Sequence, residues 1–226
     1  MFANLELAMK PMDFGAHQSA LGPQDGLENK PGRDDRAAAL SSANELQSQE
    51  ENWIREIANG NRSSFERLFH AYYRRIFGFL LRLVGRADAA EELTNDVMMG
   101  VWKGAAGFKG DSKVSTWIFG IAHFRAVSWL RRSSFETIDI DDAGPLKDPH
   151  ELKEESLLRE STREGVRRAL AKLTPAHREV IELTFYQEFS YPEIAAILSC
   201  PVNTVKTRMF YARKELRELL EERSTA

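Results

Sequence analysis

The chain has 226 residues, of which 42% are hydrophobic, and it carries 31 basic and 34 acidic side chains for a formal net charge of −3. This length suits one large globular domain or two small ones. The negative charge excludes a protein that coats nucleic acid by bulk attraction, so any DNA binding must come from local basic patches or from a partner. The one cysteine, Cys200, excludes an internal disulfide and a cysteine-rich zinc site.

No stretch approaches the roughly 18 continuous apolar residues of a membrane span, and the N-terminus lacks the basic-then-apolar order of a signal peptide. Together with the single cysteine, which fits a reducing compartment, this predicts a cytoplasmic protein without membrane insertion. Residues 1–47 are rich in Gly, Pro, Asp, Asn, Gln and Ser and show little periodicity, which predicts a disordered N-terminal extension. Met9 and Met12 leave open a start further downstream.

Order is predicted to begin at Ser48, which with Glu51 forms a capping box for a helix that ends at Asn59-Gly60. A second helix opens at Ser63, in a capping box with Glu66, and ends at Gly85. Its apolar side chains recur at helical spacing and predict an inward stripe. These are Phe65, Phe69, Tyr72, Ile76, Leu80 and Leu83.

The next helix, from Asp88, has two faces. Leu93, Val97 and Val101 line one face and predict its buried side. The other face is acidic with one apolar side chain, and consists of Glu92, Asn95, Asp96 and Met99. This face is either solvated surface or a docking face for a basic helical partner.

Residues 108–115 predict a loop, and a helix follows from Thr116 to Arg132. No acid interrupts the helix between Trp117 and Arg132, and its aromatic residues are distributed around the whole circumference. Some of them must be core. Aromatics exposed beside arginines are typical of surfaces that stack unpaired bases, while the alternative is a hydrophobic helix with a basic end.

Ten acidic and four basic residues occupy 133–164, together with Gly144-Pro145 and Pro149. This composition predicts a flexible acidic linker between two helical domains. It is either a solvated spacer or a segment that occupies a basic channel. Periodicity then returns, and Thr174-Pro175 predicts an N-cap followed by proline in the first helical turn.

Residues 190–220 predict a helix-turn-helix. Ser190 and Glu193 form a capping box, Pro201 breaks the chain, and a second helix starts near Val202. Its inward positions are Val205, Met209, Ala212 and Leu216. Five basic residues and one acid lie between Pro201 and Arg217, which suits the major groove of DNA, whereas the alternative is a solvated amphipathic helix.

The chain lacks the spacings of metal ligands, a phosphate-binding loop or a nucleophile elbow, so no cofactor, metal or catalytic residue is predicted. Two classes of function are considered on these residues: a helix-turn-helix regulator that binds duplex DNA alone, and a nucleic-acid-processing enzyme. The regulator normally needs a dimer interface to span two half-sites, and no dimerisation helix is evident. The enzyme lacks a catalytic constellation.

The motifs in combination resemble bacterial RNA polymerase sigma factors of the small, extracytoplasmic-function (ECF) type, and the resemblance covers about Trp53 to Leu220. The segments SSFERLFHAYYRRIFGFLLRLVG, ADAAEELTNDVMMGVW and FKGDSKVSTWIFGIAHFRAVSWLRR are similar to sigma region 2. The segment LTPAHREVIELTFYQEFSYPEIAAILSCPVNTVKTRMFYARKEL is similar to sigma region 4. The resemblance implies an all-α protein of two domains: 1–47 extension, 48–132 region 2, 133–160 linker and 161–226 region 4.

The resemblance also implies roles for individual residues. Core polymerase would be bound by Glu92, Asn95, Asp96 and Met99. The minus-10 element would be bound, partly as a flipped base and melted strand, by Phe108, Lys109, Asp111, Ser112, Lys113, Ser115, Trp117, Arg125, Arg131 and Arg132. The minus-35 duplex would be bound by Asn203, Thr204, Lys206, Thr207, Arg208, Phe210, Tyr211, Arg213 and Lys214. Asn95, Gly120, Phe124 and Tyr211 depart from the residues usual at their positions.

The implied partners are core RNA polymerase, through its largest-subunit clamp and its beta flap, promoter DNA as duplex and as non-template single strand, and an anti-sigma factor. The implied activity is promoter-specific initiation without catalysis by the chain itself. Localisation would be cytoplasmic, or at the membrane where an anti-sigma partner holds the protein there.

Overall fold

The structure is a computed structural model that describes residues 33–133 and 157–221. Every regular element in these two ranges is a helix, which confirms the prediction of an all-α protein. The first 32 residues of the predicted extension and residues 134–156 of the predicted linker lie outside the described residues. The described residues from Leu46 onward group into one compact unit.

Helix α2 (Arg33–Ala58) starts well before Ser48, so the prediction that a helix begins there with a capping box is wrong. Residues 33–47 contain many strong helix formers, and side-chain hydrogen bonds one turn apart support the helix, such as Gln47 Nε2 to Glu51 Oε1 at 3.0 Å. Ser48 therefore lies inside the helix and does not cap it. The predicted end is confirmed, because α2 stops at Ala58 and Gly60 has a φ of +84°.

Helix α3 (Arg62–Val84) is capped by Asn61, whose side chain accepts a hydrogen bond from the Ser64 backbone N–H at 3.2 Å. The predicted Ser63 cap is wrong, because the asparagine two residues earlier takes that role. The helix ends as predicted at Gly85, which adopts the left-handed conformation with a φ of +74°. Tyr72, Ile76, Leu80 and Leu83 are buried as predicted, whereas the rings of Phe65 and Phe69 are half-buried.

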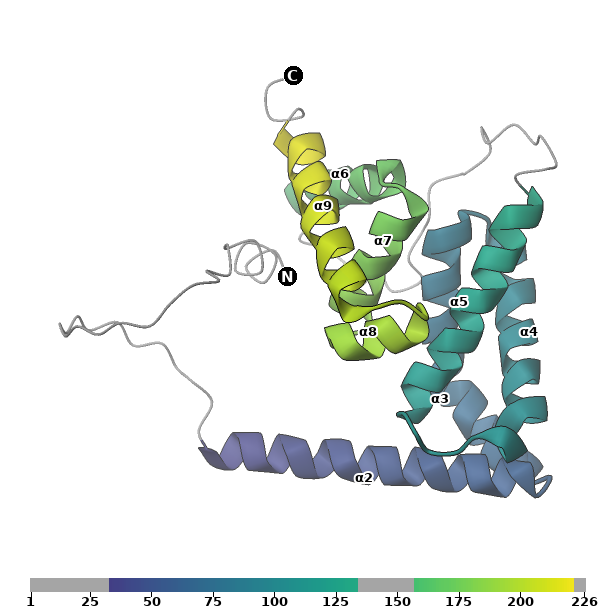
Figure 1. The fold of residues 1–226 in the computed structure, drawn as a ribbon. Coiled ribbons are helices and arrows are strands. Elements are labelled where there is room, and N and C mark those ends of the chain that lie inside the picture. Colours follow the sequence, from purple (N-terminus) through teal and green to yellow (C-terminus); the bar gives the residue numbers. More distant parts are fainter. Residues whose placement is uncertain (1–32, 134–156, 222–226) are drawn as a thin grey trace. The chain divides into compact units, whose positions relative to one another are not determined.

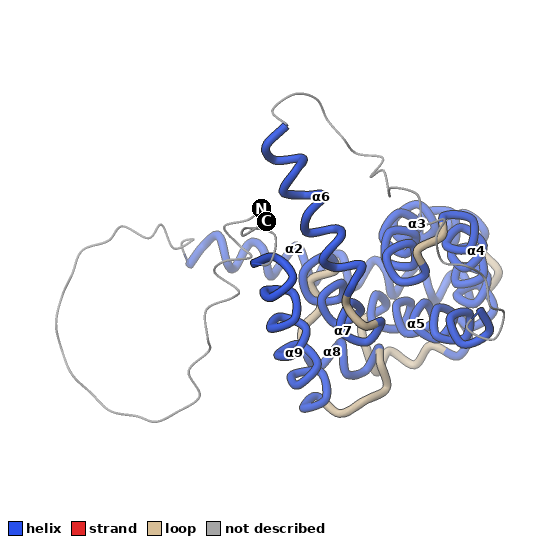
Figure 2. The backbone as a smooth tube through the Cα atoms, turned by 90° about the horizontal axis from the view of Figure 1, so that it is seen from above, coloured by secondary structure: helices blue, strands red, loops and turns tan. Residues whose placement is uncertain are grey.

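Helix α4 (Ala87–Gly104), the short 3-10 turn η1 (Ala105–Gly107) and helix α5 (Val114–Ser133) complete the first domain. Helices α3, α4 and α5 pack together as a bundle (Figures 1 and 2), and the last turns of α2 add Ile54 and Ile57 to its core. Glycines let α4 and α5 approach closely. A Cβ on Gly104 would lie 3.2 Å from the Trp117 ring, and one on Gly100 would lie 3.3 Å from Ile121.

The second domain contains α6 (Leu157–Lys172), α7 (Pro175–Ile181), a π-helical turn η3 (Glu182–Tyr186), α8 (Tyr191–Ile197) and α9 (Val202–Glu221). Thr174 caps α7, and Ser190 with Glu193 forms the capping box of α8, as predicted. The four inward residues predicted for α9 are all buried. The turn between α8 and α9 includes Ser199 at a φ of +49°. Helices α8 and α9 pack against each other, which confirms the helix-turn-helix.

Candidate nucleic-acid and polymerase interfaces

The acidic face of α4 consists of Glu92, Asn95, Asp96 and Met99, all exposed. The opposite face of α4, with Leu93, Val97 and Val101, is buried against the bundle. The amphipathic character of this helix that the sequence predicted is therefore confirmed. Met99 is 49% exposed, unusual for so large an apolar side chain. Asp96 of this face lies 3.9 Å from Arg125, as an exposed ion pair that contributes little to stability.

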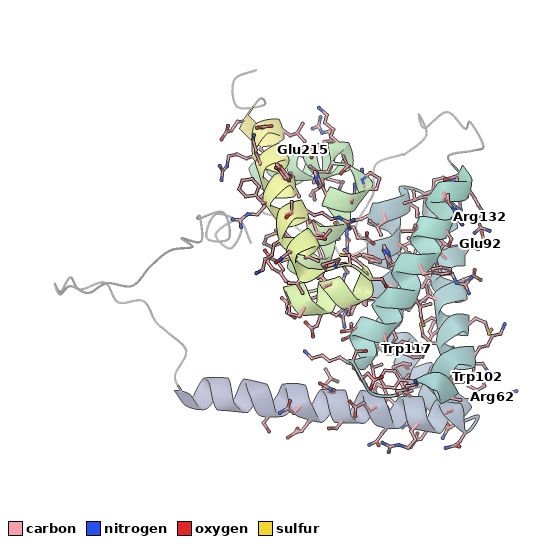
Figure 3. All side chains as sticks on the ribbon, viewed as in Figure 1. Arg62, Glu92, Trp102, Trp117, Arg132 and Glu215 are labelled. Atoms are coloured by element: carbon pink, nitrogen blue, oxygen red, sulfur yellow. The ribbon has the colours of Figure 1, made fainter. Side chains whose placement is uncertain are left out.

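The loop surface comprises residues 108–117, between η1 and the first turn of α5. The Phe108 ring packs 5.1 Å from the Trp117 ring at an interplanar angle of 43°. Gly110 adopts the left-handed conformation, with a φ of +77°, and so lets the chain turn sharply. Lys109 and Asp111 are exposed, and Ser112 is half-buried. Trp117 lies at the same end of the bundle as Trp102, and Glu92 and Arg132 mark the other end (Figure 3).

Two residues of the loop surface have internal partners that the sequence did not predict. Ser115 hydrogen bonds with Tyr72, whose hydroxyl donates to Glu50 of α2 at 2.8 Å. Burial raises the pKa of Tyr72 and also that of Glu50. Lys113 Nζ lies 2.8 Å from Glu193 Oε1 of α8. Although burial would raise the pKa of Glu193, hydrogen bonds from Lys113 and Ser190 lower it overall.

The aromatic residues of α5 divide between core and surface. Phe119 is fully buried, Trp117 and Trp129 are half-buried, and Phe124 is 66% exposed. Val127, one turn further on, is 46% exposed, and Arg131 and Arg132 are exposed at the end of the helix. The prediction that these aromatics cannot all be core is therefore correct. The exposure of Phe124 and Val127 follows from their shared helix face.

The outer face of α9 combines basic and aromatic side chains. Lys206, Thr207, Phe210 and Tyr211 are exposed as predicted, and the rings of Phe210 and Tyr211 lie 5.4 Å apart in an edge-to-face arrangement. Asn203 and Lys214 are also exposed, whereas Thr204, Arg208 and Arg213 are half-buried. The one acid in this part of the helix, Glu215, contacts His177 Nδ1 at 2.8 Å. That contact turns its carboxylate toward α7 and leaves the outer face basic.

No metal site was predicted, and within the described ranges no cluster of three His, Cys, Asp or Glu side chains could hold a metal ion. Among the same residues, no helix is long and apolar enough to cross a bilayer.

Comparisons with known proteins agree with this architecture. Residues 68–136 match the family model "Sigma-70 region 2", and residues 163–216 match "Sigma-70, region 4". RNA polymerase sigma factor YlaC of Bacillus subtilis is 33% identical over 160 residues, which are 70% of this chain and 92% of that protein. ECF RNA polymerase sigma factor RpoE of Cereibacter sphaeroides is 33% identical over 69% of this chain and 86% of its own length.

Two solved structures show the same fold. Sigma factor RpoE of Bartonella quintana, crystallised with the anti-sigma factor NepR, is 29% identical, with a TM-score of 0.56 over 70% of this chain and 96% of that one. CnrH, solved with the cytosolic domain of CnrY, has a TM-score of 0.59 over 77% of this chain and 98% of that one. CnrH is 21% identical and supports the fold alone.

The chain is therefore a sigma factor of the sigma-70 family, with a region 2 domain and a region 4 domain. Within that family it belongs to the ECF type and directs promoter-specific initiation of transcription. The alternative of a stand-alone regulator is not favoured, because the matches cover both domains and not the helix-turn-helix alone.

Proposed function

We propose that the three surfaces described above divide the work of initiation among them. The acidic face of α4 binds the clamp of core polymerase, the loop surface with α5 holds the melted minus-10 strand, and α9 reads the minus-35 duplex. The beta flap of the polymerase contacts the second domain. The chain acts by binding, and catalysis comes from the polymerase.

The observation that carries this proposal is the outer face of α9. Its lysine and two aromatic rings project from the second helix of a helix-turn-helix, the element that enters the major groove in this motif. The contact between Glu215 and His177 removes the nearest acid from that face. A negative net charge for the whole chain fits the same division, because the free protein then binds DNA weakly and polymerase supplies the remaining affinity.

The loop surface fits an unpaired strand better than a duplex. Aromatic rings at Phe108, Trp117 and Phe124 offer stacking platforms, and the arginines of α5 supply positive charge for the backbone. Each stacked base contributes about 1–3 kcal/mol in such surfaces. The internal contact of Ser115 with Tyr72 gives that residue a role in holding the loop beside its predicted contact with DNA.

An anti-sigma partner is proposed from the solved relatives, since the Bartonella quintana sigma factor was crystallised with one. The protein is proposed to act in the cytoplasm, where polymerase and promoter DNA are found, and a membrane-bound anti-sigma factor would hold it at the membrane.

Two substitutions in α9 test the duplex-reading role. Lys206→Ala in the reconstituted holoenzyme should relax the preference for one minus-35 base pair, at a cost of about 1–3 kcal/mol for the preferred base. Arg213→Ala should weaken binding to all sequences alike and reduce the salt dependence, because it is proposed to contact phosphate. Binding is measured by competition between promoter variants at two salt concentrations. If Lys206→Ala lowered the binding affinity equally for all sequences, this would contradict the proposal that α9 reads bases.

A further inference from the structure

Hydrogen bonds connect α2 to the loop surface through the core of the first domain. The Tyr72 hydroxyl of α3 donates to Glu50 Oε1 of α2 at 2.8 Å. Burial raises the pKa of Tyr72, and its hydrogen bond with Ser115 of α5 acts in the opposite direction. A hydrogen-bond donor lowers the pKa of a phenol because it stabilises the phenolate, so Ser115 donates and Tyr72 accepts. The two hydrogen bonds therefore run in one direction, from Ser115 to Tyr72 to Glu50.

Glu50 sets this direction. Tyr72 is 1% exposed and Glu50 is 9% exposed, so little water reaches either group. Burial raises the pKa of Glu50, whereas the hydrogen bond from Tyr72 and the charge of Arg75 favour its ionised form. An ionised carboxylate accepts hydrogen bonds and donates none. The Tyr72 proton is thus committed to Glu50, and the Tyr72 oxygen is left to accept from Ser115.

Ser115 is the point at which the loop surface enters the core. It lies in the first turn of α5, between Val114 and Thr116, which are 0% and 5% exposed. The side chain of Ser115 itself is half-buried, and its partner Tyr72 belongs to a different helix. The hydrogen bond to Tyr72 therefore holds one end of the loop against the bundle.

The other end of the loop is held by an aromatic contact. The Phe108 ring packs on Trp117, with the ring centroids 5.1 Å apart. Between the two ends lie the exposed residues Lys109 and Asp111, and Gly110 with a φ of +77°. The position of these residues depends on both ends, because a short loop follows the points that hold it.

Glu50 lies outside the part of the chain that was expected to bind the minus-10 element. The match to sigma region 2 covers residues 68–136, and the minus-10 residues predicted from the sequence begin at Phe108. Ile54 and Ile57, on the same helix as Glu50, are each 2% exposed and belong to the core. This part of α2 is thus fixed on the bundle and carries Glu50 to Tyr72.

We propose that Glu50 is a positioning residue for minus-10 recognition, which acts through Tyr72 to hold Ser115 and the loop surface in the geometry that binds the melted strand. Without the carboxylate, Tyr72 donates to another group or accepts from one, and Ser115 loses its fixed partner. Binding sites are sensitive to such shifts, because a functional group must lie within about 0.5 Å of its productive position. This inference rests on the proposed function, since it concerns the surface proposed to bind the minus-10 strand.

The test is transcription by reconstituted holoenzyme from two libraries built on a promoter that the wild-type holoenzyme uses, one randomised at minus 10 and one at minus 35. Sequencing of the transcripts gives the base preference at each position. Glu50→Gln keeps the shape of the side chain but lets it donate as well as accept, and Ser115→Ala removes the last donor. Glu51→Gln is the matched control, because Glu51 is the adjacent carboxylate and accepts from Gln47 of the same helix at 3.0 Å.

Glu50→Gln should lower the preference for the favoured minus-10 bases about three- to tenfold, with the minus-35 preference unchanged. Glu51→Gln should preserve both preferences. The double variant of Glu50→Gln with Ser115→Ala should lose no more than Ser115→Ala alone, because the two residues act through one set of hydrogen bonds. If Glu50→Gln fails to fold by circular dichroism, Glu50→Asp replaces it, since its shorter side chain withdraws the acceptor from Tyr72.

A purely structural role for Glu50 would lower total transcription and leave the relative base preferences as they are. An unchanged minus-10 preference in Glu50→Gln, or additive losses in the double variant, would overturn the positioning role while the proposed function stands. Absence of transcription with the wild-type protein would contradict the proposed function itself, and the positioning role with it.

Discussion

Single residues control how the loop surface is presented. The Trp117 ring lies against Gly104 and also packs on the Phe108 ring, so the absence of a side chain at position 104 sets where the indole lies. Contacts with a melted strand depend on such positioning. In enzymes, misplacing a group by about 1 Å can lower a reaction rate by about two orders of magnitude.

Gly104→Ala is therefore predicted to lower the fraction of open promoter complex by up to about tenfold, since the new Cβ displaces Trp117 while alanine favours the helix. Permanganate footprinting of the melted strand measures the effect. Gly107→Ala is the matched control, because a Cβ there meets no atom within 4 Å. Equal melting by both variants would mean that the position of Trp117 does not matter for opening.

The candidate site was largely predictable from residue types, because exposed positions on a regular helix follow from spacing. All four residues of the acidic face of α4, and Lys206, Thr207, Phe210 and Tyr211 on α9, are exposed as predicted. The partners of Ser115 and Lys113 were not predictable. Each contact joins residues far apart in the chain, and no local pattern encodes such a pairing.

At the scale of elements, α2 is tied to the first domain by a buried polar chain. Glu50 is 9% exposed and accepts a hydrogen bond from the Tyr72 hydroxyl, which also contacts Ser115 at the start of α5. Three elements are thus joined through one hydroxyl group. When a buried carboxyl loses its hydrogen-bond donor, the loss of stability exceeds the net contribution of an ordinary hydrogen bond.

Tyr72→Phe is predicted to reduce the free energy of unfolding by about 1–3 kcal/mol, because Glu50 then stays buried without this donor. Urea unfolding followed by circular dichroism gives the value. Tyr73→Phe, at a half-buried neighbouring position on the same helix, should change it by less than about 0.5 kcal/mol. Similar losses for the two variants would show that the Glu50–Tyr72 bond does not stabilise the domain.

Helix ends were predicted correctly where one residue type controls the backbone. Gly85 and the Ser190–Glu193 box are examples, since a left-handed glycine and a reciprocal cap are both local features. Ser48 and Ser63 were predicted as caps by the same rule and are not caps, because preceding residues continue the helix in α2 and Asn61 competes in α3. The π-helical turn at Glu182 has no local signal of this kind in the sequence.

At the scale of the whole molecule, the buried pair of Glu182 in η3 with Arg82 in α3 couples stability to pH. Burial raises the pKa of Glu182 to about 7, and the nearby guanidinium groups of Arg82 and Arg178 lower it only in part. The folded state therefore binds a proton at Glu182 more tightly than the unfolded state does. This contribution to stability is fully present below the ordinary carboxyl pKa and is lost as pH rises through about 7.

Between pH 5.5 and pH 8.5 the free energy of unfolding is predicted to fall by on the order of 2 kcal/mol from this group. Glu182→Gln should show a flatter dependence, because the amide does not titrate. His123 of α5, which lies 2.6 Å from Glu179 of α7, is present in both proteins, so its effect cancels in the comparison. Parallel pH profiles would show that Glu182 is not the titrating group.

The central claim is that this chain gives core RNA polymerase the ability to start at promoters with two upstream elements. The most direct measurement is transcription from a promoter library by purified core polymerase, with and without the protein, followed by sequencing of the transcript starts. The account predicts protein-dependent starts that share two motifs, near minus 35 and minus 10. No dependent starts, from a polymerase shown to be active with another sigma factor, would contradict it.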